Sequence, residues 1–404
     1  MDAGIVSRRA LSISALLIGF LAAIPIEALS ITRGPYLGRV DDVSMSVVWL
    51  TDTGSSSSVE YATDDGAWST VSDPNVSTKH VVRISPLVAG AQYRYRVVLD
   101  GQPLSETHVF RAPRDHADLT LRFGVVGDTN DVVVPGEIAA RLADADVDLV
   151  LHTGDVVYPS GEESGYDAEF FQPMAPLIVS APVLPTLGNH DVITDRGAAY
   201  LNNFVLPVND ATGDSRFYAF RQGDALFVSV DVESSEFGEG SLQYDWLQRT
   251  LQDSDAFWKF VYLHEPPYSS AESNLAVRLI LTPLFEATGV DVVFCGHMHL
   301  YERTVAIRNF ASSGPGIVYV TEGGGGASLV SFVRQDFSAY VAERHSYLVV
   351  DVEGGNLALT AHDPDGSVFD SLELHKTVPL EIRATPERIL PPKRPAAAEV
   401  SARP

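Results

Sequence analysis

The sequence predicts a mixed α/β (α+β) chain, in which an all-β module precedes a larger region where strands and helices alternate. Residues 31–112 contain several short segments in which apolar and polar residues alternate, the pattern of strands with one buried face. Residues 119–375 contain near-continuous apolar runs separated by segments with helical spacing, which is the pattern of βαβ units. A chain of 404 residues is long enough for these two regions to form separate domains.

The strands expected in the first module cover residues 44–49, 57–61, 80–84 and 93–98. The last of these runs into Asp100-Gly101, a dipeptide typical of tight hairpin turns. Trp49 is expected to be the central aromatic residue of the module's core. Because the module contains no grouping of reactive side chains, we expect the chemistry to lie in the second region.

The second region follows a linker over residues 112–118, and helices are expected at residues 135–144, 241–251 and 274–287. The first of these begins with proline and the second with a serine cap, both of which are common helix starts. Pro283 is expected to bend or restart the third helix, because proline lacks the amide proton that a helix interior needs.

The two ends of the chain differ from the rest in composition. Residues 1–30 are predicted to be an export signal, with a basic start at Arg8-Arg9 and an apolar core over residues 10–24. The alternative is a membrane anchor, but this apolar run is short for a bilayer span. We therefore expect a secreted or periplasmic protein without stable membrane insertion. Residues 376–404 are rich in proline, alanine and charge, and are expected to form a flexible tail.

The net charge of −25 argues against nucleic acids and anionic membranes as partners. It does not argue against a phosphate ester substrate, because a bound metal ion creates a local positive field. Cys295 is the only cysteine, so the chain cannot form an internal disulfide, and its place in an apolar run indicates a small buried side chain. The sequence does not indicate an oligomeric state.

Five short segments place metal-binding side chains directly after apolar runs that are predicted to be buried strands. They are Gly127-Asp128, residues 154–158, residues 188–191, residues 261–264 and residues 296–299, and they contribute Asp128, Asp155, Tyr158, Asn189, His264, His297 and His299. Ligands of α/β sheets gather at the carboxyl ends of the strands, so we expect these side chains on one rim. Seven such donors are enough for two metal ions that share one carboxylate.

Each segment also has an alternative interpretation that involves no metal ion. A Gly-Asp pair after a strand is common, Tyr158 alone would be a core or rim aromatic, and the alternating histidines at 297 and 299 would suit a hydrogen-bonded loop. The occurrence of all five segments in one order favours a metal site over these separate interpretations.

The segments resemble those of the calcineurin-like metallophosphoesterases, and specifically the purple acid phosphatases. Tyr158 stands three residues after Asp155, as the metal-bound tyrosinate of that family does, and residues 297–303 are similar to its His-x-His-x-Tyr-Glu-Arg run. The first module, which opens with residues 33–37, resembles a fibronectin type III domain in which Tyr93 ties the start of a strand to the preceding loop. The resemblance covers roughly residues 31–365.

The resemblance implies that Asp128, Tyr158 and His299 hold a ferric ion, Fe(III), and that Asn189, His264 and His297 hold a divalent ion (Fe, Zn or Mn). Asp155 would bridge the two. The division is chemically sensible, because a hard trivalent ion favours phenolate and carboxylate oxygens whereas a divalent ion favours imidazole and amide ligands. Two metal ions about 3.5–4 Å apart can bind a phosphate and deliver a bound hydroxide in line with the leaving group.

Three further features take their interpretation from the resemblance. His190 is expected to contact the substrate phosphate as a catalytic residue, the alternative being a supporting partner of Asp191 or Asn189. His152 is expected to be structural, and the glycine run at 323–326 to be a tight turn near the site. Ser273 and Asn274 stand where many plant-type members have histidines, so the usual proton donor for the leaving group is absent. With His190 as the remaining donor, a preference for aryl phosphates is expected.

The sequence thus predicts a secreted acid phosphatase that hydrolyses phosphomonoesters at a dinuclear metal centre. A phosphodiesterase of the same fold is one alternative. A non-catalytic binding protein with a fibronectin-like module and a structural metal site is another, which the complete set of seven donors disfavours.

Overall fold

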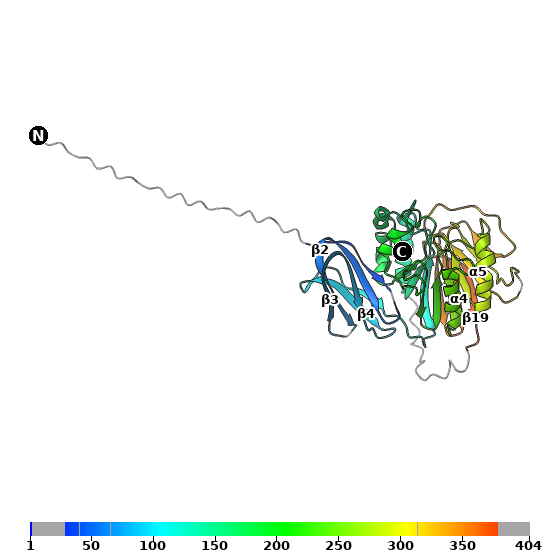
Figure 1. Ribbon diagram of the computed structural model, residues 1–404, viewed down its shortest axis with the longest axis horizontal. Helices are drawn as coiled ribbons and strands as arrows, with labels where there is room; N and C mark the ends of the chain where they lie inside the picture. Colours follow the sequence, from blue (N-terminus) through cyan, green and yellow to red (C-terminus); the bar gives the residue numbers. More distant parts are fainter. Residues whose placement is uncertain (2–28, 40, 65, 313, 379–404) are drawn as a thin grey trace, which may run out of the picture.

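The computed structural model describes residues 1, 29–39, 41–64, 66–312 and 314–378. The predicted export signal and nearly all of the predicted tail therefore lie outside the described residues. Within the described ranges, no helix is both long and apolar enough to cross a membrane. An N-terminal all-β region, blue to cyan in Figure 1, lies beside a larger α/β region.

The N-terminal region contains six antiparallel strands: β1 (Ile31–Gly38), β2 (Met45–Thr63), β3 (Ser69–Ile84), β4 (Gln92–Leu99), β5 (Gln102–Pro103) and β6 (His108–Arg111). The strand β2 pairs with β1 over its first half, with β3 over most of its length, and with β4 over its last six residues. It therefore joins the strands into one hydrogen-bonded network. Trp49 is buried in the core of this region, as predicted, where its ring stacks on His80.

Two strands predicted for this region prove to be one. Residues 44–49 and 57–61 lie in the single strand β2, and the polar stretch between them is accommodated by register shifts between Leu50, Ser55 and Ser57. Such bulges keep a polar segment within a strand while adding a local bend. The hydroxyl of Tyr93 accepts a hydrogen bond from the backbone N–H of Val88 at 3.0 Å, which is the predicted tie to the preceding loop.

The α/β region contains two sheets. One has the order β19-β18-β17-β7-β8-β9, with β7 (Thr120–Val126), β8 (Leu149–His152), β9 (Val183–Pro185), β17 (Tyr347–Glu353), β18 (Asn356–His362) and β19 (Val368–His375). The other has the order β10-β11-β12-β13-β15-β14-β16, with β10 (Tyr218–Gln222), β11 (Ala225–Ser229), β12 (Trp258–Tyr262), β13 (Val292–Cys295), β14 (Tyr301–Thr304), β15 (Val318–Glu322) and β16 (Ser338–Ala342). The strands β7, β8 and β9 are parallel, as are β11, β12, β13 and β15.

The two sheets face each other across a shared core. Phe123 of β7 contacts Phe227, Phe260 and Phe294 of the other sheet, with ring centroids 5.2, 5.3 and 5.9 Å apart. These rings are fully shielded from solvent. Aromatic pairs in this spacing range add to the hydrophobic stabilisation of a core. The α/β region is therefore a sandwich of two sheets, with helices on its outside.

The helices are α1 (Val133–Asp144), α2 (Ala175–Ile178), α3 (Ala198–Asn203), α4 (Leu242–Asp253) and α5 (Leu275–Thr288), and a π-helical turn covers Asp167–Phe171. In Figure 1, α4 and α5 lie on the outer side of the α/β region. Ser241 caps α4 as predicted, since its side chain accepts the N–H of Tyr244. The expected restart at Pro283 is wrong, because α5 continues through it. Leu281, Leu284 and Phe285 are buried around the proline, so packing outweighs the lost hydrogen bond.

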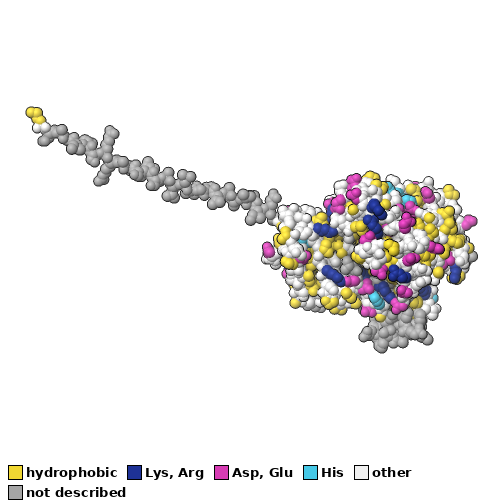
Figure 2. Space-filling model, in the orientation of Figure 1, with side chains coloured by type: hydrophobic (Ala, Val, Ile, Leu, Met, Phe, Trp, Pro, Cys, Tyr) yellow, Lys and Arg dark blue, Asp and Glu magenta, His cyan; other side chains and the backbone are white. Residues whose placement is uncertain are grey.

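One buried arginine attaches the N-terminal region to the α/β region. Arg33 of β1 donates hydrogen bonds to Asp167, Glu163 and Asn203, and its guanidinium lies over the ring of Phe171. Its side chain is 5% exposed, whereas both carboxylates are 49% exposed. Acidic, basic and hydrophobic side chains are intermixed on the surface seen in Figure 2.

Candidate metal centre

The seven predicted ligands lie on turns that directly follow five strands. Asp128 follows β7, Asp155 and Tyr158 follow β8, Asn189 follows β9, His264 follows β12, and His297 and His299 follow β13. The first three strands belong to one sheet and the last two to the other. The predicted single rim is therefore formed jointly by the carboxyl ends of strands from two facing sheets.

Asp128, Tyr158 and His299 form one group of donors. The phenol oxygen of Tyr158 lies 3.3 Å from Oδ1 of Asp128 and 3.2 Å from Nε2 of His299. The distance from Nε2 of His299 to Oδ1 of Asp128 is 3.4 Å. Ligand atoms that each lie about 2.0–2.2 Å from one ion are separated by about 3 Å. The group therefore fits a single metal ion.

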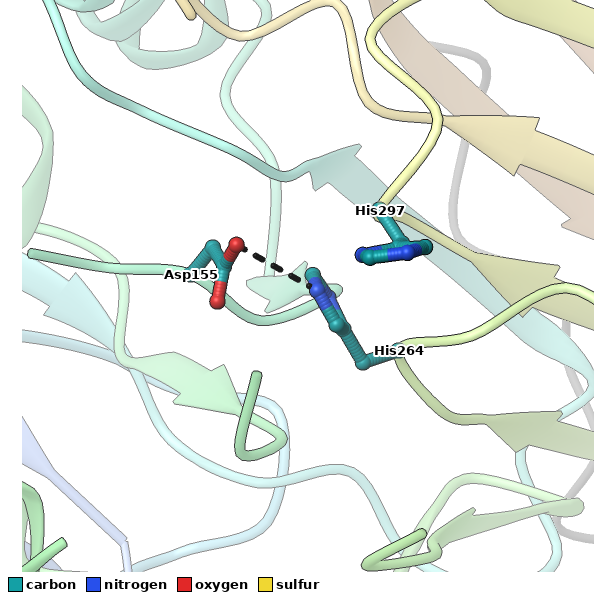
Figure 3. A group of neighbouring side chains, drawn as sticks. All are labelled: Asp155, His264 and His297. Atoms are coloured by element: carbon teal, nitrogen blue, oxygen red, sulfur yellow. Dashed lines mark ion pairs between the residues drawn. The ribbon is translucent and has the colours of Figure 1, made fainter. Parts of the chain in front are cut away.

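Asn189, His264 and His297 form a second group together with Asp155. Nε2 of His264 lies 3.1 Å from Oδ1 of Asn189 and 3.4 Å from Oδ2 of Asp155. Donor atoms of Asp155, His264 and His297 all lie within 4.8 Å of one another. Figure 3 shows these three side chains directed toward a common centre, with the ion pair between Asp155 and His264 dashed. A mixed imidazole, amide and carboxylate set suits a divalent transition metal.

The carboxylate of Asp155 is in reach of both groups. One of its oxygens lies 3.4 Å from Nε2 of His264, and its negative charge is close enough to Tyr158 to raise the pKa of that phenol. Burial raises the pKa of Tyr158 far above its ordinary value, and the carboxylates of Asp128 and Asp155 raise it further. A phenolate at this position therefore requires a compensating cation.

Backbone strain is concentrated at the ligands. Asp128, Asp155 and His297 have φ angles of 58°, 55° and 67°, in the left-handed region that side chains rarely adopt. Gly188 allows the close approach of two ligand turns, because a Cβ there would lie 2.2 Å from the backbone nitrogen of Asp155. Non-glycine residues in this conformation cost of order 1–3 kcal/mol each and cluster at functional sites.

Backbone carbonyls orient the imidazole ligands. Nδ1 of His264 donates to the carbonyl of Thr153, and Nδ1 of His299 donates to the carbonyl of Ser328, both at 2.8 Å. A proton held on Nδ1 leaves Nε2 as the free donor atom toward an ion. In both residues Nε2 is the atom that faces the other donors, so the tautomers suit metal binding.

His190 lies at the edge of the same group, with its side chain 31% exposed. Nδ1 is 2.6 Å from the carbonyl of Pro159, and Nε2 is 3.9 Å from Oδ2 of Asp155. The alternative partner Asp191 is fully buried and accepts backbone N–H groups of Gly188 and Val156. The ring of His190 is thus held by the backbone with Nε2 directed to the metal side.

Other predicted features occupy local structural roles. His152 is fully buried beside the hydroxyl of Thr129, and burial lowers its pKa to about 3, so it stays neutral. The glycine run packs against the first ligand turn through a hydrogen bond from Gly325 to the carbonyl of Gly127. Asn274 caps α5 by accepting the N–H of Val277, and Ser273 accepts the N–H of Ser269.

One carboxyl near the centre was not predicted. Glu233 lies on the turn after β11, and its charge interacts with those of His264 and Asp155. The signal was available, because residues 225–230 are an apolar run followed by Asp231 and Glu233, as in the five ligand segments. Glu233 does not stand out in the sequence, because the apolar run before it has no glycine at its end and no histidine.

With this geometry established, comparisons with known proteins place the chain in a class. Residues 121–301 match the model of the calcineurin-like phosphoesterases. This range contains all seven candidate ligands, and the chain carries a calcineurin-like phosphoesterase domain.

Two curated relatives indicate a more specific class of phosphoesterase. Purple acid phosphatase 18 of Arabidopsis thaliana is 27% identical over 320 residues, covering 74% of this chain and 72% of the relative. A phosphoenolpyruvate phosphatase of Allium cepa is 25% identical over 375 residues, covering 81% and 76%. The chain is thus similar to purple acid phosphatases over most of its length, and it is an enzyme of the phosphoester hydrolase class, as predicted.

Solved structures agree on the fold. The purple acid phosphatase PPD1 from yellow lupin (Lupinus luteus) seeds superimposes with a TM-score of 0.75 at 20% identity, covering 90% of this chain and 77% of that one. The structure of PhoD gives a TM-score of 0.61 at 14% identity, covering 85% and 92%. At these identities the comparison supports the arrangement of an all-β region before an α/β sandwich.

Proposed function

We propose that this protein is an acid phosphatase that hydrolyses phosphomonoesters at a dinuclear metal centre. Asp128, Tyr158 and His299 would hold Fe(III), and Asn189, His264 and His297 would hold a divalent ion (Fe, Zn or Mn). The observation that carries the proposal is the pair of donor groups with Asp155 in reach of both. When bound, the two ions supply positive charge for a phosphate and lower the pKa of water at the site.

The protein groups around the centre would bind and orient the ester. His190 faces the centre with Nε2, while its Nδ1 is held by the carbonyl of Pro159. A protonated imidazole in this position donates a hydrogen bond to a phosphate oxygen. The strained ligand turns at Asp128 and His297 hold the donors in place before substrate arrives, which reduces the reorganisation needed during the reaction.

We also propose roles for the flanking regions. Residues 31–112 would form a fibronectin type III-like domain, which the hydrogen bond between Tyr93 and Val88 supports. Residues 1–30 would direct export to a secreted or periplasmic location, which the basic start and apolar core of their sequence support. The acidic net charge supports the absence of a nucleic acid partner.

The proposal is tested with the purified full chain. We expect two metal ions per chain by elemental analysis, one of them iron, and release of phosphate from p-nitrophenyl phosphate at acid pH. Bis(p-nitrophenyl) phosphate serves as the diester comparison and is expected to react far more slowly. Active protein with one metal or none would contradict the dinuclear centre, and faster reaction of the diester would replace the monoesterase assignment by the phosphodiesterase.

A further inference from the structure

We propose that Glu233 is a catalytic residue that protonates the departing oxygen of the phosphate ester. The inference rests on the proposed function and extends it to the leaving group. Ser273 and Asn274, which stand where many plant-type purple acid phosphatases have histidines, are bound to local backbone groups and supply no donor. Glu233, on the turn after β11, is placed to supply the proton instead.

The position of Glu233 follows from the parallel pairing of β11 with β12. Ser229 lies opposite Tyr262, and the N–H of Val230 donates to the carbonyl of Tyr262 at 3.0 Å. Extension of this register brings Asp231 level with His264, so that Glu233 lies just beyond a predicted ligand on the same rim. On the other side, the hydroxyl of Thr186 donates to the carbonyl of Val230 at 3.2 Å. The turn is thus held between the ligand turns that carry Asn189 and His264.

The turn that carries Glu233 is fixed by its neighbour Asp231. The buried carboxylate of Asp231 accepts the N–H groups of Glu233 and Ser234 at 2.9 and 2.8 Å, and also the hydroxyls of Ser234 and Ser235 at 2.6 Å. From outside, Arg216 donates to the hydroxyl of Ser234 at 3.1 Å. A side chain on such a turn has a defined direction, which a catalytic group requires.

The Glu233 carboxyl is not fully hydrogen-bonded within the described residues. Oε1 of Glu233 is buried, and within the described part of the chain it has no hydrogen-bond partner. A buried polar atom without a partner destabilises the folded state, so its presence calls for an explanation. The neighbouring carboxyl of Glu265 differs, because it accepts the side-chain amide of Asn274. Among the described residues, no protein group therefore occupies this oxygen of Glu233.

The charged surroundings suit a proton donor. The groups that act on Glu233 are His264, Glu265, Asp155 and Asp231. Burial raises the pKa of the Glu233 carboxyl to about 8 in the metal-free protein. As a water-derived hydroxide attacks phosphorus, the bond from phosphorus to the ester oxygen breaks, and the Glu233 proton passes to that oxygen. Inorganic phosphate and the alcohol leave, and the carboxylate regains a proton from solvent.

The experiment compares leaving groups in the metal-loaded full chain. The variants are Glu233→Gln, which keeps the shape but cannot donate an acidic proton, and Glu236→Gln, which makes the same change at an exposed position of the same loop. We measure kcat/KM for p-nitrophenyl phosphate, whose leaving group needs little protonation, and for glycerol phosphate, whose alkoxide needs a proton. Metal content and the thermal unfolding temperature are measured for each variant.

Glu233→Gln is expected to reduce kcat/KM for glycerol phosphate by roughly 10²–10⁴-fold, the contribution of a positioned acid, with little loss for p-nitrophenyl phosphate. Glu236→Gln is expected to match wild type on both. Equal losses on the two esters, or no loss, would overturn the assignment of Glu233 alone. A wild-type protein with two metals that hydrolyses neither ester would overturn the proposed function and this assignment with it. If the glutamine variant does not fold, Glu233→Ser gives the same comparison.

Discussion

The phenol oxygen of Tyr158 lies 3.2 Å from Nε2 of His299, although the two residues are 141 positions apart in the chain. The same oxygen lies 3.3 Å from Oδ1 of Asp128. A tyrosine side chain in hydrogen-bond range of an imidazole and a carboxylate fits the proposed role as the third ligand of one ion. Since burial and the two nearby carboxylates raise its pKa, the phenolate forms only with that ion present.

Tyr158→Phe is therefore expected to remove the visible absorption band that a tyrosinate gives with Fe(III). The fold should survive, because phenylalanine fills the same volume. Visible spectroscopy and circular dichroism check the two points. Tyr166→Phe is the matched control, since Tyr166 is a buried tyrosine on the following segment whose hydroxyl has no partner within the described residues. Retention of the band in Tyr158→Phe would show that another residue supplies the colour.

Asp155→Asn is expected to lose both metal ions together, because it removes the charge that the two donor groups share. Elemental analysis after gel filtration would show fewer than one metal per chain, and activity should fall at least 10³-fold. Asp253→Asn, at the exposed end of α4, is the control and should keep both ions. Loss of a single ion from Asp155→Asn would mean that this carboxylate serves one site only.

His190→Ala is expected to reduce the hydrolysis of aryl and alkyl phosphates by the same factor. In the proposed division of roles His190 binds the phosphate, which both substrates share, and Glu233 serves the leaving group. Loss of a hydrogen bond to a charged group costs about 1.5–3 kcal/mol, or roughly 10- to 150-fold in kcat/KM. His116→Ala in the exposed linker is the control. A larger loss of kcat/KM for alkyl esters than for aryl esters would indicate that His190 protonates the leaving group.

Glu322 is expected to make the metal-free protein less stable as the pH rises. This residue is fully buried, and burial raises its pKa to about 8 from an ordinary value of 4.5, although the hydroxyl of Ser346 donates to its carboxyl. Below pH 4.5 the carboxyl is protonated in both the folded and the unfolded state. Between 4.5 and 8 only the folded state keeps the proton, so the free energy of unfolding falls by up to about 1.4 kcal/mol for each pKa unit.

Urea unfolding at pH 5.0 and 7.5 measures this effect. Glu322→Gln cannot titrate and should lose less stability between the two pH values than wild type does. Glu353→Gln, at the exposed end of β17, should behave as wild type. The assignment fails if wild type and Glu322→Gln lose the same amount of stability over this interval.

The sequence was sufficient to predict which residues meet at the centre, and the reason is local. An apolar run that ends in Gly-Asp or Gly-His specifies a buried strand and the side chain at its carboxyl end, and both properties depend on a few neighbouring residues. The continuity of α5 through Pro283 was not predictable in this way, because it depends on how Leu281, Leu284 and Phe285 pack in a core shared with the sheet. The assignment of β7 and β12 to different sheets likewise depends on pairings between segments far apart in the chain.

Glu233 shows a second limit of local patterns. The apolar run before Glu233 marks its position in the sequence, but its unpaired carboxyl oxygen is recognised only once the neighbouring donors have been located in space. A metal site needs several ligand residues, and together these leave a motif in the sequence. A single proton donor leaves no such motif, because it needs only to lie near the departing oxygen.

Because the candidate ligands follow strands of both sheets, bound ions would link the two sheets at the end of the sandwich where these ligands lie. Removal of metal would then free the two layers to separate at that rim, while the aromatic contacts of Phe123 keep the far side closed. If the protein is exported as proposed and meets proteases, the bound metal ions would also stabilise the fold against degradation. A cell that fails to load the metals would thus produce a chain that is both inactive and easily degraded.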